Sequence, residues 1–283
     1  IIYFNPSPRG IGFYRDILYI IILKFFKKKL VFHLHGRGFK KKFKKSYIWK
    51  KLLIKLFKDV NLICLSKKLT KDILLFNDKK KKVFILNNFS LIKKDKIKKN
   101  KLFTFIYLSN LVPDKGVLTF LNAISLLNKK KYKNFSGKII GGSSNEPFFK
   151  KVKQKLYEVK NVEYLGKLYG HNKDKELNSS NVFILPTKFA NEAFPLSILE
   201  AMAFGLPIIT SNIGGISDIV DHNKNGFVIK KNNHKLYAKF MAIYLKNRKL
   251  VKIHGINAKT KHDKNYTPKI FENRFIKILK EII

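Results

Sequence analysis

Cysteine is nearly absent from this chain, because Cys64 is the single one among 283 residues. One thiol excludes an intramolecular disulfide, so we expect a reducing, cytoplasmic location. Long apolar runs are lacking near the start of the chain as well. The longest there, residues 17–23, is far short of the roughly 20 residues that cross a bilayer. A disulfide scaffold and a membrane-spanning segment in this region are therefore not expected.

Acidic residues are few: 18 Asp and Glu stand against 60 Lys and Arg, for a formal net charge of +42. Taken alone, this charge favours nucleic acid or an anionic membrane as the partner. Only five of the basic residues are Arg, however, and nucleic-acid surfaces usually rely on Arg for bidentate contacts. Lys occurs beside many Ile, Asn, Phe and Tyr, whose codons are AT-rich, so biased base composition is the simplest explanation. We expect no nucleic-acid partner, whereas attraction to anionic lipid stays compatible with the charge.

Short apolar runs typical of buried strands alternate with helical patterns along the whole chain. This alternation predicts an α/β fold, with parallel sheets wound on both faces by helices. The candidate strands are residues 1–4, 30–35, 60–65, 83–86, 102–108, 137–141, 162–165, 182–185, 207–210 and 226–229. The helical patterns include residues 116–127, 173–179, 195–204, 234–245 and 268–282.

A lysine-rich stretch with few large apolar side chains, residues 90–101, interrupts the alternation. We interpret it as an interdomain linker. The predicted segments are a partial N-terminal acceptor-side domain (1–90), a linker (91–101), a C-terminal nucleotide-sugar-binding domain (102–265) and a terminal helix (266–283). Four candidate strands precede the linker, which predicts an incomplete N-terminal doubly wound sheet. The terminal helix is expected to cross back to that domain.

The most informative segment is NEAFPLSILEAMAFGLPIIT, residues 191–210. Glu192 and Glu200 stand eight positions apart, and Pro195 between them opens an apolar run with helical spacing. Since proline is favoured at the first helical position, Glu192 is expected before a helix and Glu200 more than a turn inside it. A helix start is ready to bind an anion. Carboxylates on either side suit a nucleotide-sugar, whose diphosphate lies between sugar hydroxyls and ribose.

This segment resembles the E-x7-E region of retaining glycosyltransferases of family 4, which have the GT-B fold of two Rossmann-like domains facing a cleft. The similarity continues through SNIGGISDIV (211–220) and NGFV (225–228). The resemblance implies transfer of a hexosyl group, with retention of configuration, from a nucleoside-diphosphate sugar to a hydroxyl of a polysaccharide or lipid-linked acceptor of the cell envelope. It implies a catalytic role for Glu192. The residues that it implies for donor binding are Phe194, Pro195, Leu196, Ser197 and Glu200.

The segment from Tyr107 to Gly116 follows the first strand of the second domain, where open α/β sheets bind ligands. Lys115 lies at the mouth of the expected helix, within reach of a diphosphate. The segment resembles the family's Gly-Arg-Leu-x-x-x-Lys-Gly loop, whose cations neutralise the leaving diphosphate. Lys115 matches that loop as a catalytic and donor-binding residue, whereas Asn110 takes the place of the Arg and donates without charge. With 55 lysines in the chain (60 minus 5 Arg), a plain surface lysine is the alternative.

A strand that ends in a His-Gly corner is expected at residues 31–36, VFHLHG. His33 and His35 should share one face, because successive strand residues face opposite ways. A metal pair and a packed core histidine are the alternatives, but no nearby Cys or acid cluster supplies a further metal ligand. The segment resembles the family's His-Gly strand end, which implies a catalytic contact of His35 with the donor sugar or the acceptor. The turn at Gly141 and Gly142 is similar to the family's donor-side glycine turn, and glycines permit close backbone approach.

No Asp-x-Asp motif occurs, although glycosyltransferases that hold the diphosphate through a divalent metal usually carry one. We therefore expect no metal and no cofactor, with positive charge supplied by Lys115 and the helix start at Pro195. Two competing functions are a non-enzymatic polyanion binder, which clustered Arg would favour, and an inactive fragment, since the family's first strand and glycine-rich loop are absent.

Aromatic rings stand beside lysines in the N-terminal portion. They include Phe25, Phe26, Phe39, Tyr47 and Trp49, next to Lys24, Lys27–Lys29, Lys40, Lys44, Lys45, Lys50 and Lys51. This pattern suits helices that lie on an anionic membrane surface, which would be the inner face of the cytoplasmic membrane. Ordinary solvated helices with codon-driven lysines are an equally supported interpretation.

Overall fold

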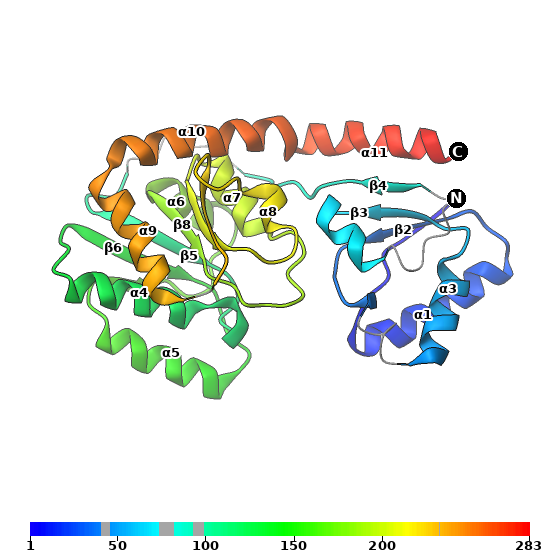
Figure 1. Ribbon diagram of the computed structural model, residues 1–283, viewed down its shortest axis with the longest axis horizontal. Coiled ribbons are helices and arrows are strands. Elements are labelled where there is room, and N and C mark those ends of the chain that lie inside the picture. Colours follow the sequence, from blue (N-terminus) through cyan, green and yellow to red (C-terminus); the bar gives the residue numbers. More distant parts are fainter. Residues whose placement is uncertain (41–45, 74–81, 93–98, 232) are drawn as a thin grey trace. The chain divides into compact units, whose positions relative to one another are not determined.

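The computed structural model describes residues 1–40, 46–73, 82–92, 99–231 and 233–283. The chain divides into two compact units. Unit 1 comprises Ile1–Asn88, Asn191–Phe194 and Pro268–Ile283, and unit 2 comprises Phe89–Ala190 and Pro195–Thr267. Each unit is built on one parallel sheet flanked by helices (Figure 1). The predicted α/β class with two Rossmann-like sheets is thereby confirmed.

Unit 1 has a four-stranded parallel sheet in the order β1-β2-β3-β4. Its strands are β1 (Ile2–Phe4), β2 (Leu30–Leu34), β3 (Asn61–Cys64) and β4 (Val83–Ile85). Its helices are α1 (Gly10–Phe25), α3 (Tyr47–Phe57), the 3-10 helix η1 (Lys67–Asp72) and α11 (Pro268–Ile282). Each strand falls inside a run that the sequence pattern had indicated.

The two faces of the unit 1 sheet are covered by different parts of the chain. On one face, Phe32 and Leu62 pack in a core with residues of α1 and α3. On the other face, Val31 and Ile63 pack with Ile278 of α11. This alternation follows from the two-residue period of a strand. Residues of α11 thus pack on this face of the unit 1 sheet.

Unit 2 has a six-stranded parallel sheet in the order β10-β9-β8-β5-β6-β7. The strands are β5 (Phe103–Leu108), β6 (Phe135–Ile140), β7 (Val162–Tyr164), β8 (Val182–Leu185), β9 (Ile208–Ser211) and β10 (Gly226–Ile229). The helices are η2 (Pro113–Lys115), α4 (Val117–Lys129), α5 (Glu146–Glu158), α6 (Gly170–Ser179), α7 (Leu196–Ala203), α8 (Ile216–Ile219), α9 (His234–Lys246) and α10 (Arg248–Asn265).

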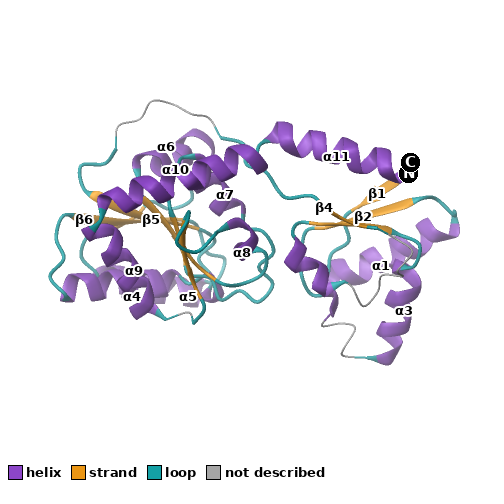
Figure 2. Cartoon of the chain, turned by 45° about the horizontal axis from the view of Figure 1, so that its top comes forward, coloured by secondary structure: helices purple, strands orange, loops and turns teal. Residues whose placement is uncertain are grey.

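Figure 2 shows α4, α5 and α9 on one face of this sheet and α6, α7 and α10 on the other. The strand order reverses between β5 and β8, because β6 and β7 lie beyond β5 whereas β9 and β10 lie beyond β8. Such a reversal opens a crevice at the carboxyl ends of the two central strands, where α/β sheets bind ligands.

Pro195 is the N-cap of α7, with extended backbone (φ −67°, ψ 120°). It was predicted as the first helical residue, but the helix begins one position later.

Of the predicted linker, residues 93–98 lie outside the described residues, as do Lys44 and Lys45. At the end of the linker, Asn100 donates its backbone N–H to Ser179 O of unit 2 at 3.0 Å.

Candidate active site

Two loops meet at the carboxyl ends of the central strands of unit 2. One follows β5 and carries Asp114, and the other follows β8. Asp114 O accepts from the backbone N–H of Lys188 at 2.6 Å and from Thr187 Oγ1 at 3.3 Å. Direct hydrogen bonds therefore join the two loops that flank the point where the strand order reverses.

Lys115 lies on the first of these loops, at the end of η2. Its carbonyl accepts from the buried Tyr107 hydroxyl at 3.2 Å, which fixes the backbone. Its ammonium lies 4.8 Å from the centroid of the Phe189 ring on the second loop, within the range of a cation–π contact. The sequence thus placed Lys115 correctly at a strand-to-helix corner, while its role toward a diphosphate stays a prediction.

Gly116 makes this corner possible. Its φ is +82°, and a Cβ there would stand 2.0 Å from Pro186 O. Gly166 offers a matched comparison, since its φ is +69° and nothing lies within 4 Å of its Cβ position. Gly116→Ala should lower the free energy of unfolding by about 3 kcal/mol or more, and Gly166→Ala by about 1–2 kcal/mol. Urea titration followed by circular dichroism measures both, and equal losses would contradict the close approach at Pro186.

Beside this corner, unit 2 contains a cavity of about 370 Å³. Its wall is formed by the loops that follow β5, β6 and β7. The lining residues are 108–110, 112, 140–144 and 167–169. Asn110, Gly141 and Gly142, all predicted to bind the donor, thus line one cavity. Lys115 and Glu200 are not among its lining residues.

Backbone hydrogen bonds hold the three loops together. Leu111 N–H donates to Gly142 O at 2.7 Å, and Gly141 N–H donates to Gly166 O at 2.8 Å. The Tyr164 hydroxyl also donates to Gly141 O, at 2.9 Å. A Cβ on Gly141 would stand 1.9 Å from Ser109 O, at a φ of +150°, so this position requires glycine. The cavity wall is therefore a set of fixed backbone groups.

Glu200 lies in α7, and its Oε1 accepts from Lys173 Nζ of α6 at 2.7 Å. Burial raises the pKa of Glu200, while the ion pair with Lys173 opposes this increase. Lys173 itself follows Tyr169, a lining residue of the cavity, by one helical turn. Glu200 is thereby connected to the cavity wall. Lys173 was not among the residues predicted from the sequence, because the lysines of α6 are spaced like those of other helices in this lysine-rich chain.

The first turn of α7 carries the predicted donor-binding residues Leu196 and Ser197. Its N-cap, Pro195, has no side-chain hydrogen bond to the helix, since proline has no acceptor in its side chain. The first-turn N–H groups are therefore not capped by that residue, which suits an anion.

Glu192 and Phe194 lie on the loop before α7, and both are buried, with Glu192 6% exposed. Phe194 O accepts from Asn88 Nδ2 at 3.3 Å. Residues Asn191–Phe194 belong to unit 1, which corrects the expectation that Glu192 lies within the second domain. The hydrogen bond from Asn88 is one of the contacts that join this segment to unit 1. The predicted convergence of Glu192, Lys115 and Glu200 on one pocket stays a prediction.

His33 and His35 share one face at the end of β2, as expected, and their ring centroids lie 4.1 Å apart. His33 is buried, and its Nδ1 is 2.5 Å from the Tyr3 hydroxyl. Burial, and then the neighbouring His35, lower the pKa of His33 to about 3, so this ring is neutral at physiological pH. Partial desolvation also lowers the pKa of His35, which lies exposed just beyond the strand. A neutral His35 can exchange hydrogen bonds with sugar hydroxyls.

Within the described ranges, no three His, Cys, Asp or Glu side chains are grouped so that they could hold a metal ion. The expectation of metal-independent chemistry stays a prediction.

Comparison with known proteins adds a second line of argument. A protein of Haemophilus influenzae named as an uncharacterized glycosyltransferase is 30% identical over 169 residues, 59% of this chain and 46% of that protein. The capsular polysaccharide biosynthesis glycosyltransferase CapM of Staphylococcus aureus is 26% identical over 204 residues, 70% of this chain and 52% of CapM. The chain thus spans about half the length of these curated relatives.

Among solved structures, HepE of Anabaena in complex with UDP is similar, with a TM-score of 0.79 at 15% identity over 94% of this chain and 76% of HepE. At this identity the likeness concerns the fold alone, and the predicted GT-B fold is confirmed. The model of the family Glycosyl transferases group 1 matches residues 88–261, more than half of the chain. The residues singled out at positions 110–116, 141–142 and 192–200 all fall within that match. This chain therefore belongs to the glycosyl transferases group 1 family.

Proposed function

We propose that this chain transfers a sugar from a nucleoside-diphosphate sugar to a hydroxyl of a saccharide or lipid-linked acceptor, with retention of configuration. The observation that carries the proposal is the cavity of unit 2, whose glycine-containing wall adjoins the corner bearing Lys115. A flat base needs close backbone approach, and a diphosphate needs fixed positive charge next to it. The name of CapM, a capsular polysaccharide biosynthesis enzyme, supports a polysaccharide product.

In this proposal the nucleoside lies in the cavity and the diphosphate lies toward Lys115 and the first turn of α7. The carboxylate of Glu200 holds the ribose. Its Oε1 is taken by Lys173, and Oε2 has no hydrogen-bond partner among the residues described. Oε2 can therefore accept from a ribose hydroxyl while Lys173 fixes the orientation of the carboxylate.

Departure of the nucleoside diphosphate leaves the anomeric carbon positively charged. Lys115 offsets the charge that grows on the departing oxygens, and the dipole of α7 acts in the same sense. Glu192 supplies a carboxylate toward the sugar, and His35 a neutral hydrogen-bonding group. We propose that no divalent metal takes part.

Asn110 gives a direct test, because it stands where the resemblance expects Arg. Asn110→Arg should tighten binding of a nucleoside diphosphate by about tenfold, since an added charged donor on the cavity wall would meet the diphosphate. Asn110→Ala is the control and should bind no more tightly than the unchanged chain. Isothermal titration calorimetry against UDP, GDP, ADP and dTDP measures the affinities and identifies the preferred base.

Two results would oppose the proposal. One is failure of the whole panel to bind at low salt. The other is equal binding of inorganic polyphosphate, which would favour a polyanion binder that uses charge alone. Product analysis with the preferred donor and a lipid-linked saccharide then tests transfer itself.

A further inference from the structure

Helix α1 of unit 1 carries apolar side chains on its outward side. Phe13, Ile17 and Ile20 point into the core. The residues that point outward recur at helical spacing. They are Ile11, Tyr14, Leu18, Ile22 and Phe25, and their exposed fractions are 89, 49, 62, 52 and 81%. This stripe runs along the whole helix and is too regular to be scattered surface residues.

Helix α3 lies beside α1 and extends the same surface. The rings of Tyr14 and Trp49 meet with centroids 5.6 Å apart. At the other end of α1, Lys24 Nζ donates to Lys55 O at 3.3 Å and to Lys58 O at 2.5 Å. Tyr47 and Ile48 add exposed apolar groups at the start of α3. We call α1 and α3 together the α1–α3 surface.

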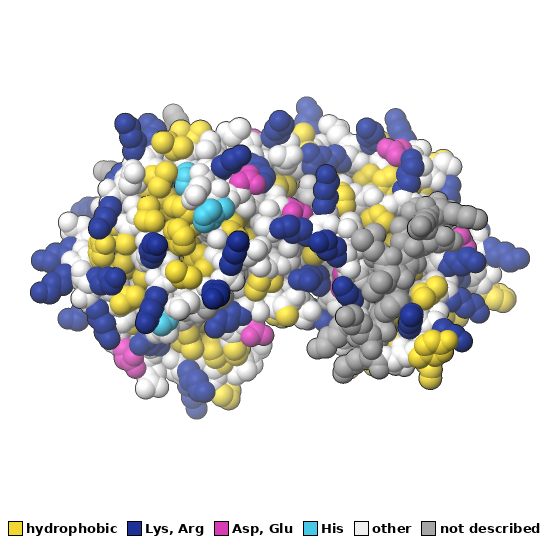
Figure 3. Space-filling model, in the orientation of Figure 1, with side chains coloured by type: hydrophobic (Ala, Val, Ile, Leu, Met, Phe, Trp, Pro, Cys, Tyr) yellow, Lys and Arg dark blue, Asp and Glu magenta, His cyan; other side chains and the backbone are white. Residues whose placement is uncertain are grey.

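The charge of this surface is almost entirely of one sign. The basic residues on the two helices and at their ends are Arg9, Arg15, Lys24, Lys27, Lys28, Lys29, Lys50, Lys51, Lys55 and Lys58. The acids counted in the same way are two. Asp16 is buried and paired with Arg15 Nη2 at 2.8 Å, and Asp59 follows Lys58 at the end of α3. Figure 3 shows how few Asp and Glu side chains stand among the Lys and Arg of the visible face.

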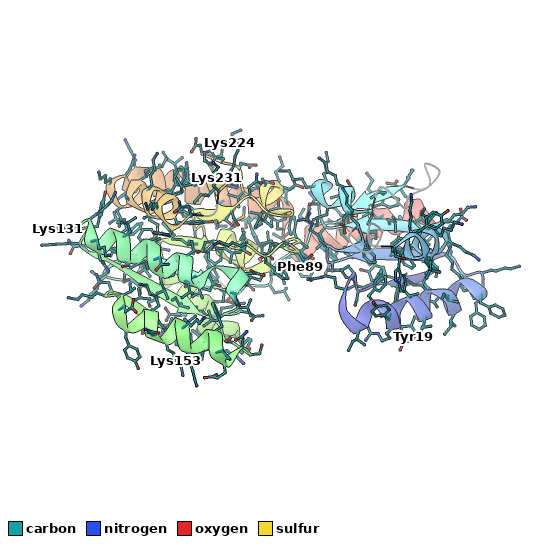
Figure 4. The ribbon with its side chains drawn as sticks, turned by 60° about the horizontal axis from the view of Figure 1, so that its bottom comes forward. Tyr19, Phe89, Lys131, Lys153, Lys224 and Lys231 are labelled. Carbon is teal, nitrogen blue, oxygen red and sulfur yellow. The ribbon has the colours of Figure 1, made fainter. Side chains whose placement is uncertain are left out.

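We propose that the α1–α3 surface docks on an anionic lipid bilayer. Aliphatic and aromatic side chains would enter the boundary between headgroups and acyl chains, while the lysines reach the anionic headgroups. Tyr19, which projects from α1 (Figure 4), has its ring 5.9 Å from the Arg15 guanidinium and suits the interfacial layer. An acidic protein partner would match the charge, but it gives no reason for an apolar stripe along the entire helix.

This inference does not rest on the transferase proposal, because it concerns unit 1 and needs no donor. Docking on the bilayer would bring the chain to the membrane in which a lipid-linked acceptor is held. In the part of the chain that the structure describes, none of the helices has the length and apolar character to cross a bilayer.

Two lysine triplets of this chain allow a matched test. Lys27–Lys29 follow α1, and Lys129–Lys131 end α4 in unit 2. Of the first triplet, Lys29 also donates through Nζ to Ile283 O at 3.1 Å. Each triplet holds one residue with positive φ, Lys27 (51°) and Lys131 (58°), so replacement of all three by Gln removes the same charge from similar backbones. Figure 4 shows Lys131 projecting from the end of α4.

Co-sedimentation of the full chain with vesicles compares phosphatidylcholine alone with an equal mixture of phosphatidylcholine and phosphatidylglycerol. Binding should require the anionic lipid and disappear near 1 M salt, where the Debye length is about 3 Å. The Lys27–Lys29 triple variant should bind about 100-fold more weakly, at roughly fivefold per lysine. The Lys129–Lys131 variant should bind like the unchanged chain. Equal losses of vesicle affinity in the two variants would mean that binding depends only on the net charge of the chain, and would overturn the proposal.

The apolar stripe needs a test of its own. Ile22→Glu should weaken vesicle binding by about tenfold or more, whereas Ile253→Glu on α10 should not. The two isoleucines are matched, since their exposed fractions are 52 and 50%. A second copy of this chain is the other possible occupant of the surface, and sedimentation velocity without lipid tests for it. If Ile22→Glu converts a dimer to a monomer and leaves vesicle binding unchanged, the surface joins two copies and the membrane proposal is wrong. UDP affinity, measured in parallel, should be the same in both variants.

Discussion

Glu192→Gln is expected to lower kcat about a hundredfold or more while affinity for the nucleoside diphosphate stays nearly unchanged. The substitution keeps the size of the side chain and its capacity to accept hydrogen bonds, but removes the negative charge. That charge is proposed to act when the anomeric carbon becomes cationic, and therefore in the transition state more than in the bound ground state. Burial of Glu192 keeps water from screening the charge, which makes its loss costly.

Glu176 provides the control for this substitution. It lies in α6, accepts from Lys138 at 2.6 Å and has no proposed part in transfer, so Glu176→Gln should leave kcat within a few fold of its usual value. Initial rates over a range of donor concentrations separate kcat from KM. A Glu192→Gln variant that turns over normally would remove Glu192 from the chemistry, even if nucleotide binding held as proposed.

Glu200→Ala should weaken binding of the nucleoside diphosphate by about 1.5–3 kcal/mol, the usual value of a hydrogen bond to a charged group, or about 10- to 150-fold in Kd. The reason is the free acceptor Oε2 that Lys173 orients. Glu176→Ala is again the matched control, because it breaks a Lys–Glu pair of similar burial in the same unit. Calorimetry should show lost affinity for the first variant alone, and comparable losses in both would mean that α6 packing matters and the ribose contact does not.

The pKa of Glu200 gives the same prediction a pH dependence. A carboxylate that accepts from ribose must be ionised, so affinity is present above the pKa of Glu200 and declines as pH falls through it. Burial raises this pKa, so the decline should begin at a higher pH than for an ordinary glutamate. Lys173→Met removes the opposing ion pair and should move the decline to still higher pH. A midpoint that does not move in this variant would contradict the pairing.

Local patterns in the sequence predicted the described strands well and indicated where several candidate site residues lie along the fold. The ten strands among the described residues follow from apolar runs with sharp ends, since a parallel sheet is covered on both faces and its strands are therefore apolar throughout. The corner of Lys115 and the glycines of the cavity wall were found because strand ends and glycines are visible locally. Lys173 was missed, because its partner Glu200 lies 27 positions away and no spacing rule connects them.

The membership of Asn191–Phe194 in unit 1 was missed for a similar reason. The segment lies between β8 and α7, both in unit 2, so its neighbours along the chain suggest the wrong unit. Its contacts with unit 1 include the hydrogen bond from Asn88, more than a hundred positions earlier. Such contacts depend on the folded arrangement and leave no mark in local composition.

Unit 1 is assembled from three separate stretches, and the chain passes between the units after Asn88, Ala190, Phe194 and Thr267. During synthesis the sheet face formed by Val31, Ile63 and Leu86 is made well before α11, the helix that packs on it, whereas the described segments of unit 2 lie between the two in the sequence. Unit 2 can therefore complete its core first, whereas the sheet of unit 1 is joined by residues 268–283 only afterwards. A nascent chain stalled before them presents bare apolar strands, the kind of surface that chaperones bind.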